Sequence, residues 1–433
     1  MTIPVLTAVT GSPWESRLVA ALDSGSGVEV VRRCVDIADL LAAAAAGHGR
    51  AVLLSADLRR LDREVVRRLG ASGVAVVGVA AEDDQGEIRL RQLGVARVVS
   101  AHGGDAEIVD AVSAAVEDLV DPASANGAGT TTLMQASGEV VPTGRETSAE
   151  VGLGRIFAIW GPTGAPGRTT LAVNLAAEIS MLGRATLLAD ADTYGGAVAQ
   201  MLGLLDEAPG LAGAARAANN GQLDLASLAR HARQMTPQLR VLTGITRTER
   251  WPEVRPASLD VVWALARGLA EATVVDCGFS LEQDEELSFD TAAPRRNGAT
   301  LTTLEQADVV VAVSSAEPVG LQRFVRGLSD LRGAVPGADV RVVVNRLRAS
   351  VVGPQPEEQV RAALQRHAAV PRVTFVPDDA TAADAALMRG QMLAEAAANS
   401  PMRQAIAQLA ADLIGVPDAT RKPRHRNRAR THT

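Results

Sequence analysis

Lysine, cysteine and aromatic residues are all scarce in this chain of 433 residues. Lys422 is the only lysine, so arginine carries almost all of the positive charge. The two cysteines, Cys34 and Cys277, lie in apolar, strand-like segments of different halves of the chain, which favours reduced thiols over a disulfide. Aromatic residues make up only 2% of the sequence, and no recognition motif is evident, which argues against sequence-specific reading of nucleic acid.

Long apolar runs are also missing. The longest run of small apolar residues, Leu40–Ala46, falls far short of the ~20 residues that span a bilayer. Met1–Val9 lacks the basic segment that precedes the apolar part of an export signal. A net charge of −7 argues against general coating of nucleic acid by the folded body. We therefore expect a cytoplasmic protein, and its 47% hydrophobic residues are ample for folded cores.

The length of the chain favours two domains over one, because single cores seldom grow this large. A stretch rich in Gly, Ser and Thr lacks apolar periodicity and is typical of a flexible linker. Near the end, Arg421–Arg430 is rich in basic residues without apolar partners, which predicts a disordered tail. We divide the chain into a first domain at 1–121, a linker at 122–150, a second domain at 151–416 and a basic tail at 417–433.

The first domain alternates short apolar runs with amphipathic stretches. Strands that are apolar throughout and alternate with helices imply a parallel sheet covered on both faces. Five such units are typical of an α/β fold of the flavodoxin or response-regulator receiver kind. We predict strands at Val5–Val9, Val28–Val31, Ala51–Leu54, Val74–Val79 and Ala96–Val99, and helices at Pro13–Leu22, Ile37–Ala46, Leu61–Leu69, Gly86–Leu93 and Ala106–Leu119.

The acidic residues of receiver domains are missing from the matching strand ends. Receivers place acidic residues after the first strand and an aspartate at the end of the third. Here Thr10 follows the first strand and Ser55 ends the third, with Asp57 two positions late. We interpret the segment as a receiver-like domain without phosphoacceptor chemistry, used for docking or dimerisation. The alternative is an α/β domain unrelated to receivers.

A glycine-rich turn between a strand and a helix is the strongest local motif. Arg155–Trp160 has the pattern of a buried strand, Gly161–Thr170 forms the turn, and Leu171–Leu182 is an apolar helix. Backbone N–H groups in such a turn form an anion-binding nest, and the helix N-terminus adds partial positive charge. The spacing matches the phosphate-loop pattern G-x-x-x-x-G-K-[ST], except that Arg168 replaces lysine. Thr169 falls where a hydroxyl group binds Mg²⁺.

Further polar residues follow apolar strands in the second domain. Asp190 and Asp192 follow one strand, Asp276 ends another, and Asn345 and Pro377 stand at the ends of two more. Ligands of open parallel sheets bind at the carboxyl ends of strands, so these residues can converge on one nucleotide. The aspartates are candidates to hold magnesium or to orient an attacking water.

Taken in order, these motifs resemble the MinD/ParA superfamily, whose phosphate loop reads KGGxGKT and aligns with Thr163–Thr170. The resemblance implies a P-loop NTPase domain with a mostly parallel sheet covered by helices, and ATP or ADP with Mg²⁺ as ligands. We assign catalytic roles to Asp192 and Asp276, and metal binding to Thr169, Asp190 and Asp276. The nucleotide-binding candidates are Gly161, Gly164, Ala165, Pro166, Gly167, Arg168, Thr169, Thr170, Asn345, Arg346, Pro377 and Asp378.

The sequence departs from the family at two lysine positions. Arg168 takes the place of the phosphate lysine, and Thr163 that of a signature lysine, which in the family reaches across a nucleotide-sandwich dimer. A guanidinium group is wider and geometrically more demanding than an ammonium group. We therefore expect nucleotide binding to be more secure than hydrolysis. Arg295 or Arg296 is a candidate substitute for the missing lysine, and the simpler interpretation places both in a solvated loop.

A receiver-like domain ahead of the ATPase resembles the CpaE/TadZ branch, which is linked to localisation and assembly of Tad-type pili. The phosphate loop also resembles that of septum-site determinants. We expect an ATP-binding spatial regulator that forms a nucleotide-dependent homodimer, has weak or absent ATPase activity, and binds proteins of a pilus or division machinery. The alternatives are a non-catalytic scaffold with a vestigial nucleotide site and a DNA-partitioning ATPase. Arg421–Arg430 offers peripheral contact with an anionic membrane or non-specific contact with DNA.

Overall fold

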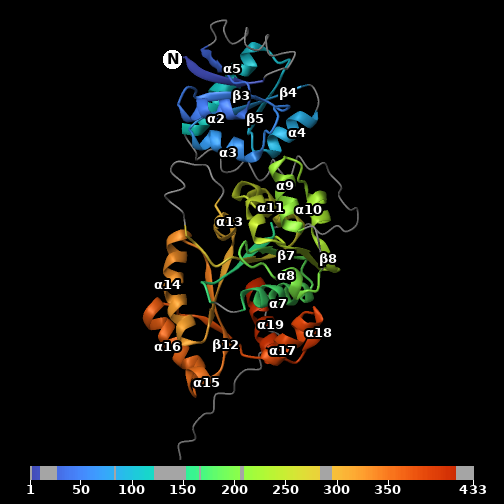
Figure 1. Ribbon diagram of the computed structural model, residues 1–433, viewed down its shortest axis with the longest axis vertical. Helices are drawn as coiled ribbons and strands as arrows, with labels where there is room; N and C mark the ends of the chain where they lie inside the picture. Colours follow the sequence, from blue (N-terminus) through green and yellow to red (C-terminus); the bar gives the residue numbers. More distant parts are fainter. Residues whose placement is uncertain are drawn as a thin grey trace, which may run out of the picture.

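The computed structural model describes residues 2–9, 27–81, 84–120, 153–164, 167–204, 209–282 and 295–415. These residues form two α/β domains, each built around its own sheet, and Figure 1 shows one domain above the other. The predicted helix Pro13–Leu22, the predicted linker at 122–150 and the predicted tail at 417–433 lie outside the described residues.

The N-terminal domain contains a five-stranded parallel sheet with the order β2-β1-β3-β4-β5. This order is that of flavodoxin-like folds, which confirms the fold predicted from the alternation of strands and helices. Its strands are β1 (Ile3–Ala8), β2 (Val28–Arg33), β3 (Ala51–Ser55), β4 (Ala75–Ala80) and β5 (Arg97–Ser100). Its helices are α2 (Ile37–Ala45), α3 (Arg63–Ala71), α4 (Asp84–Gln92) and α5 (Asp105–Val120).

Alternate residues of the first sheet enter two separate cores. Leu6 of β1 packs in a core with Leu40 of α2 and Leu69 of α3. Its neighbour Val5 packs on the opposite face, where α5 contributes Val112. Because both faces are covered by helices, the inner strands β1, β3 and β4 are mostly apolar on both sides, as the continuous apolar runs predict.

The second domain contains an eight-stranded sheet with the order β13-β12-β11-β6-β10-β7-β9-β8, parallel except for the edge pair β8 and β9. Its strands are β6 (Arg155–Trp160), β7 (Thr186–Ala191), β8 (Arg233–Thr236), β9 (Leu239–Leu242), β10 (Ala272–Cys277), β11 (Val309–Ser315), β12 (Val340–Leu347) and β13 (Val373–Pro377). Its helices are α7 (Arg168–Met181), α8 (Val198–Met201), α9 (Gly210–Asn219), α10 (Leu225–His231), α11 (Pro256–Leu269), α13 (Gly298–Gln306), α14 (Pro318–Ala334), α15 (Ala349–Val352), α16 (Pro356–Ala368), α17 (Ala380–Arg389), α18 (Leu393–Ala396) and α19 (Pro401–Ile414), with a 3-10 turn at Thr248–Glu253.

The central strand β6 separates the two cores of this domain. Ile156, Ala158 and Trp160 point into the core formed with helices α9, α11, α13, α14 and α16. Phe157 and Ile159 point into the other core, which is covered by α7 and α17 to α19. Because β6 lies between β11 and β10, the glycine-rich turn that follows it emerges near the middle of the carboxyl edge of the sheet.

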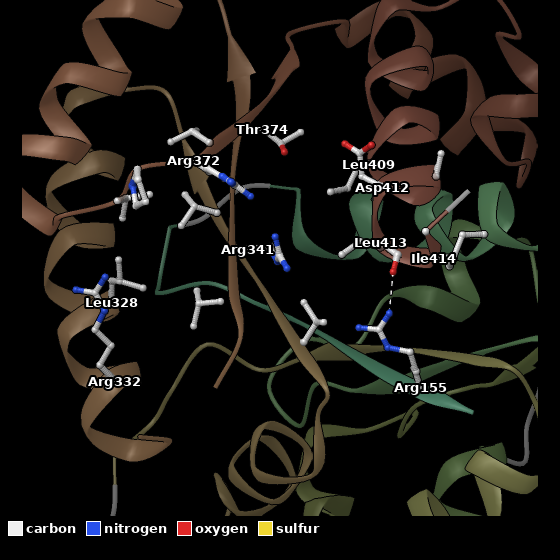
Figure 2. A pocket seen from close by; sticks show the side chains of 18 residues that line it. Arg155, Leu328, Arg332, Arg341, Arg372, Thr374, Leu409, Asp412, Leu413 and Ile414 are labelled. Carbon is white, nitrogen blue, oxygen red and sulfur yellow. Dashed lines mark hydrogen bonds between the residues drawn. The ribbon is translucent and has the colours of Figure 1, made fainter. Parts of the chain in front are cut away.

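A groove of about 860 Å³ lies at the opposite, amino edge of the same sheet. Its lining includes Arg155, Val309, Val340 and Val373, the first residues of β6, β11, β12 and β13. Figure 2 shows Arg155 donating to the carbonyl of Leu413 at the end of α19, at a distance of 2.9 Å. Because the predicted site residues lie at or just beyond the carboxyl ends of the strands, this groove is separate from the predicted site.

Among the helices that the structure describes, none combines the length and the apolar character that crossing a bilayer requires.

The two domains meet where α3 of the first packs against α9 and α11 of the second. Asn219 Nδ2 at the end of α9 donates to Asp62 Oδ2 at 3.1 Å, and Arg255 Nη1 lies 3.8 Å from the same oxygen. In addition, Asp260 of α11 faces Arg63 of α3; burial raises the pKa of Asp260, and the charge of Arg63 offsets part of this rise. The interface therefore pairs charges of opposite sign in both directions.

Asp62 also caps α3, because its Oδ1 accepts the N–H of Val65 at 2.9 Å. We expect Asp62→Ala to lower the free energy of unfolding by about 2 kcal/mol, since both the helix cap and the contact between domains are lost. Asn219→Ala removes only the contact and should cost about 1 kcal/mol. Asn220→Ala, at an exposed neighbouring position, is the control. Scanning calorimetry checks that Asp62→Ala lowers the unfolding midpoint most and Asn219→Ala less. An Asn219→Ala midpoint equal to that of Asn220→Ala would contradict the expected contact.

Candidate functional site

The glycine-rich turn has the backbone that a phosphate loop requires. Gly164 and Gly167 have φ angles of +73° and +96°, which side chains with a Cβ rarely adopt. A Cβ atom on Gly167 would also collide with Nδ2 of Asn345. The side-chain amide of Asn345, on β12, therefore lies directly against the start of α7. The predicted site residues Ala165 and Pro166 lie outside the described residues.

Arg168 connects the two ends of this turn. Its Nη1 donates to the carbonyl of Gly161 at 2.7 Å, and its Nη2 lies 3.5 Å from Oδ2 of Asp192. The side chain of Arg168 is only 16% exposed, and its guanidinium carbon lies 6.0 Å from the ring centre of Phe279. The guanidinium group is thus held inside the site by three different contacts.

Thr169 and Asp276 form a short side-chain hydrogen bond in the site. Thr169 Oγ1 donates to Asp276 Oδ2 at 2.6 Å, which joins the first turn of α7 to the end of β10. Asp276 is completely buried, and its second oxygen, Oδ1, has no hydrogen-bond partner among the described residues. A buried, unpartnered carboxylate oxygen beside a hydroxyl group is a hard-oxygen environment, which suits Mg²⁺.

Asp190 holds the loop that follows β7. Its Oδ1 accepts the N–H of Asp192 and its Oδ2 accepts the N–H of Val198, each at 3.1 Å. Cβ atoms on Gly196 or Gly244 would each come within 2.7 Å of its carboxyl group, so backbone packs closely around it. Burial raises the pKa of Asp190 to about 7. In this conformation, Asp190 acts on the backbone of its own loop.

Asp192 is the aspartate that meets Arg168. Its Oδ1 accepts the N–H groups of Tyr194 at 2.8 Å and Gly195 at 3.2 Å, so the carboxylate also shapes the loop. Its Oδ2 is left facing the guanidinium group of Arg168. The structure thus brings all three predicted aspartates to one edge of the sheet and gives each a different partner.

The buried aspartates repel each other. The strand register places Asp276 beside Asp190, because β10 and β7 are neighbours. Burial raises the pKa of Asp276 well above its usual range, and the negative charge of Asp190 adds to the rise, while Thr169 and Arg168 oppose it. Among the described residues, no three His, Cys, Asp or Glu side chains are placed to hold a metal ion by themselves. A magnesium ion here would need further oxygen ligands, such as phosphate and water.

Four of the remaining predicted residues lie at the carboxyl ends of β12 and β13: Asn345, Arg346, Pro377 and Asp378. Asn345 is 4% exposed, whereas Arg346 is exposed and has a φ of +56° at a break in the pairing of these strands. Asp378 follows Pro377 and accepts from Arg348 Nη1 at 2.9 Å. Asn345 is therefore brought to the phosphate loop, while the carboxylate of Asp378 is engaged in an ion pair. Thr170 lies in the first turn of α7, next to Thr169.

Arg296 is held by the loop after β7. Its guanidinium carbon lies 4.0 Å from the ring centre of Tyr194, and its Nη2 donates to the carbonyl of Thr193 at 3.0 Å. Asn297 accepts from the hydroxyl group of Tyr194 at 2.6 Å. These contacts join the loop after β7 to the start of α13, and they leave Arg296 fixed on Tyr194.

One arginine at this edge was not selected from the sequence. Arg323 of α14 lies against Gly164, because a Cβ atom on that glycine would collide with Nη1 of Arg323. Helical spacing from Gly320 and Gly327 is the only sequence pattern that points to it, and that spacing has meaning only when the position of α14 is known.

The burial of Asp276 lowers the free energy of unfolding, and a substitution can measure this effect. Because its pKa is raised on folding, the protein loses stability as the pH rises above ~4, the usual pKa of the group. We expect Asp276→Asn to increase the free energy of unfolding of the ligand-free protein near pH 8 by on the order of 1 kcal/mol. Near pH 4 the gain should vanish, since the carboxyl group is then largely neutral.

Urea unfolding at the two pH values measures this difference. Asp412→Asn, at an exposed position of α19, is the matched control and should show no gain that depends on pH. A loss of stability in Asp276→Asn near pH 8 would contradict the argument.

Comparison with known proteins places these features in a family. Residues 157–390 match the family model described as the CobQ/CobB/MinD/ParA nucleotide binding domain. A search of curated proteins gave no match.

Solved structures provide a further comparison. A ParA family ATPase from Chlorobium tepidum TLS is 19% identical, covers 60% of this chain and 99% of its own, and has a TM-score of 0.51, which shows a shared fold. The cell division ATPase MinD of Pyrococcus furiosus is 20% identical, with coverages of 61% and 99% and a TM-score of 0.49. The septum site-determining protein MinD from Pyrococcus horikoshii OT3, complexed with Mg-ADP, is 20% identical, with coverages of 60% and 96% and a TM-score of 0.47.

The family match spans more than half of the chain and includes the glycine-rich turn, the three aspartates and Asn345. The chain therefore belongs to the CobQ/CobB/MinD/ParA nucleotide-binding domain family.

Proposed function

We propose that this protein is a nucleotide-dependent spatial regulator that binds ATP or ADP with Mg²⁺ and hydrolyses ATP weakly or not at all. The hydrogen bond between Thr169 and Asp276 carries the proposal. It places the hydroxyl group of the phosphate loop and a buried carboxylate at one point, beneath a glycine-rich turn at the start of a helix. Such a turn binds phosphate through backbone N–H groups and the helix dipole.

The residues present fit both parts of the ligand. Gly161, Gly164, Gly167 and the N-terminus of α7 provide the cradle for the phosphates. Thr169 and Asp276 would hold Mg²⁺, which supplies positive charge to neutralise the phosphate oxygens when it is bound.

The base would lie toward Asn345, which contacts Gly167 from β12. Arg346, Pro377 and Asp378 border this side. In this arrangement the loop would bind phosphate, and the residues at the carboxyl ends of β12 and β13 would select the base.

The contacts of Arg168 support the proposal that hydrolysis of ATP is weak. Its guanidinium group already donates to Gly161 and faces Asp192, so it must leave these contacts to follow charge that develops on the outer phosphate. Stabilisation of a transition state depends on donors that are already in place. Asp192, the candidate to orient water, is occupied by the backbone of its loop and by the same arginine. Binding is thus favoured over turnover.

The same proposal extends to the cellular role. Nucleotide state would control a homodimer that docks proteins of a pilus or division machinery, in the cytoplasm or peripherally at the inner face of the membrane. The N-terminal domain would serve docking, and the boundaries at 1–121 and 151–416 are part of this proposal. The combination of a receiver-like sheet with a nucleotide-binding domain supports it.

Two other functions remain as alternatives. The contacts of Arg168 within the loop are compatible with a scaffold whose nucleotide site is vestigial. A DNA-partitioning ATPase would use Arg421–Arg430, which lies outside the described residues, as a non-specific arm. The scaffold would bind nucleotide weakly or not at all, unlike the protein that we propose. The DNA-partitioning ATPase would bind DNA with an affinity that falls steeply with salt.

Calorimetric titration with Mg-ATP and Mg-ADP, together with a phosphate-release assay, tests the proposed function. We expect binding by the wild type with little release of phosphate. Asp276→Ala should weaken binding that depends on Mg²⁺ by about tenfold or more, because a ligand to the ion is lost. Arg168→Lys should raise phosphate release, because an ammonium group is a compact charge that moves freely.

The Asp412→Asn protein again serves as the control, since its change lies far from the loop at the exposed end of α19. Rapid phosphate release by the wild type would overturn the claim of weak hydrolysis. Absence of binding to either nucleotide would favour the scaffold.

A further inference from the structure

Helix α14 is seated tightly against the phosphate loop. A Cβ atom on Gly327 would lie 2.9 Å from Cβ of Pro162 and 3.3 Å from the ring of Trp160, so the helix backbone touches the start of the loop. One end of the same helix is fixed by Gly320, where a Cβ atom would collide with Oγ of Ser315. These two glycines determine the distance and the rotation of α14 relative to the loop.

Arg323 lies between them on the same helix face. It follows Gly320 by three positions and precedes Gly327 by four, and residues at this spacing are neighbours on a helix surface. Its guanidinium group lies against Gly164: a Cβ atom there would lie 3.5 Å from Cζ and 3.7 Å from Cδ of Arg323 and would collide with Nη1. The side chain thus covers the loop from the α14 side.

The charge of Arg323 is not neutralised within the described part of the chain. The side chain of Arg323 forms neither a hydrogen bond nor an ion pair with the other described residues, and it is exposed. Arg168, by contrast, is largely buried and faces Asp192. An exposed cation without an acidic partner, beside a turn that binds anions, can move toward a phosphate group without breaking other contacts.

We propose that Arg323 is a phosphate-binding residue that acts within its own chain and supplies, beside Gly164, the positive charge that Thr163 lacks. This inference rests on the proposed function, because it requires a nucleotide in the loop. A guanidinium group presents several donors in one plane and can bind phosphate oxygens from the side of the loop. Attraction to a nearby cation grows with the charge of the ligand, so Arg323 favours a triphosphate over a diphosphate.

Substitutions of Arg323 test this role. Affinities for Mg-ATPγS and Mg-ADP are measured by calorimetry for the wild type, Arg323→Ala, Arg323→Lys and Arg326→Ala. Arg326 is the matched control, because it is an exposed arginine three residues further along α14. We expect Arg323→Ala to weaken Mg-ATPγS binding about tenfold, the loss of one charge-assisted hydrogen bond, and to weaken Mg-ADP binding less.

Arg323→Lys should recover most of the lost affinity, since it restores the charge, and Arg326→Ala should match the wild type. Equal effects of Arg323→Ala and Arg326→Ala would overturn the role of Arg323, as would equal losses for the two nucleotides or no recovery in Arg323→Lys. Failure of the wild type to bind either nucleotide would instead overturn the proposed function, and this inference with it. The midpoint of thermal unfolding confirms that each variant is folded.

Discussion

The hydrogen bond from Thr169 to Asp276 joins the first turn of α7 to the end of β10, and the geometry of the candidate site depends on it. It holds the phosphate loop over a carboxylate that has no exposure to solvent. Parallel pairing of β10 with β7 then brings Asp190 alongside Asp276, so two acidic groups share one buried edge. Such an arrangement is unfavourable for folding and favourable for a cation, which is the usual compromise at a binding site.

Two arginines near this acidic edge differ in how they are held. Arg168 lies inside the loop and contacts Gly161 and Asp192, whereas Arg323 lies outside it on α14 and has no polar side-chain partner among the described residues. A planar guanidinium group binds well from a fixed direction but follows a moving charge poorly. Under the proposed function, this arrangement would favour retention of nucleotide over rapid turnover.

The N-terminal domain is connected to the site through α9. The last residue of this helix, Asn219, donates to Asp62 of α3, and its first residue donates to Thr243. Gly244, which follows Thr243 in the sequence, packs closely against Asp190. A continuous series of contacts therefore runs from the interface between the domains to the loop after β7. Hydrogen bonds and close backbone packing of this kind hold the elements in one relative position.

The sequence alone determined the α/β class, the five alternating strand and helix units of the first domain and the positions of the phosphate loop and its aspartates, because hydrophobic periodicity and strand-end residues are local properties. Only the tertiary structure decided which partner each aspartate has. It also decided that α3 packs against α9 and α11. The same holds for Arg323, which is distant from Gly164 in the sequence and meets it because Gly320 and Gly327 allow α14 to approach the loop. Contacts of this kind depend on how helices pack across the sheet, and no local pattern records that packing.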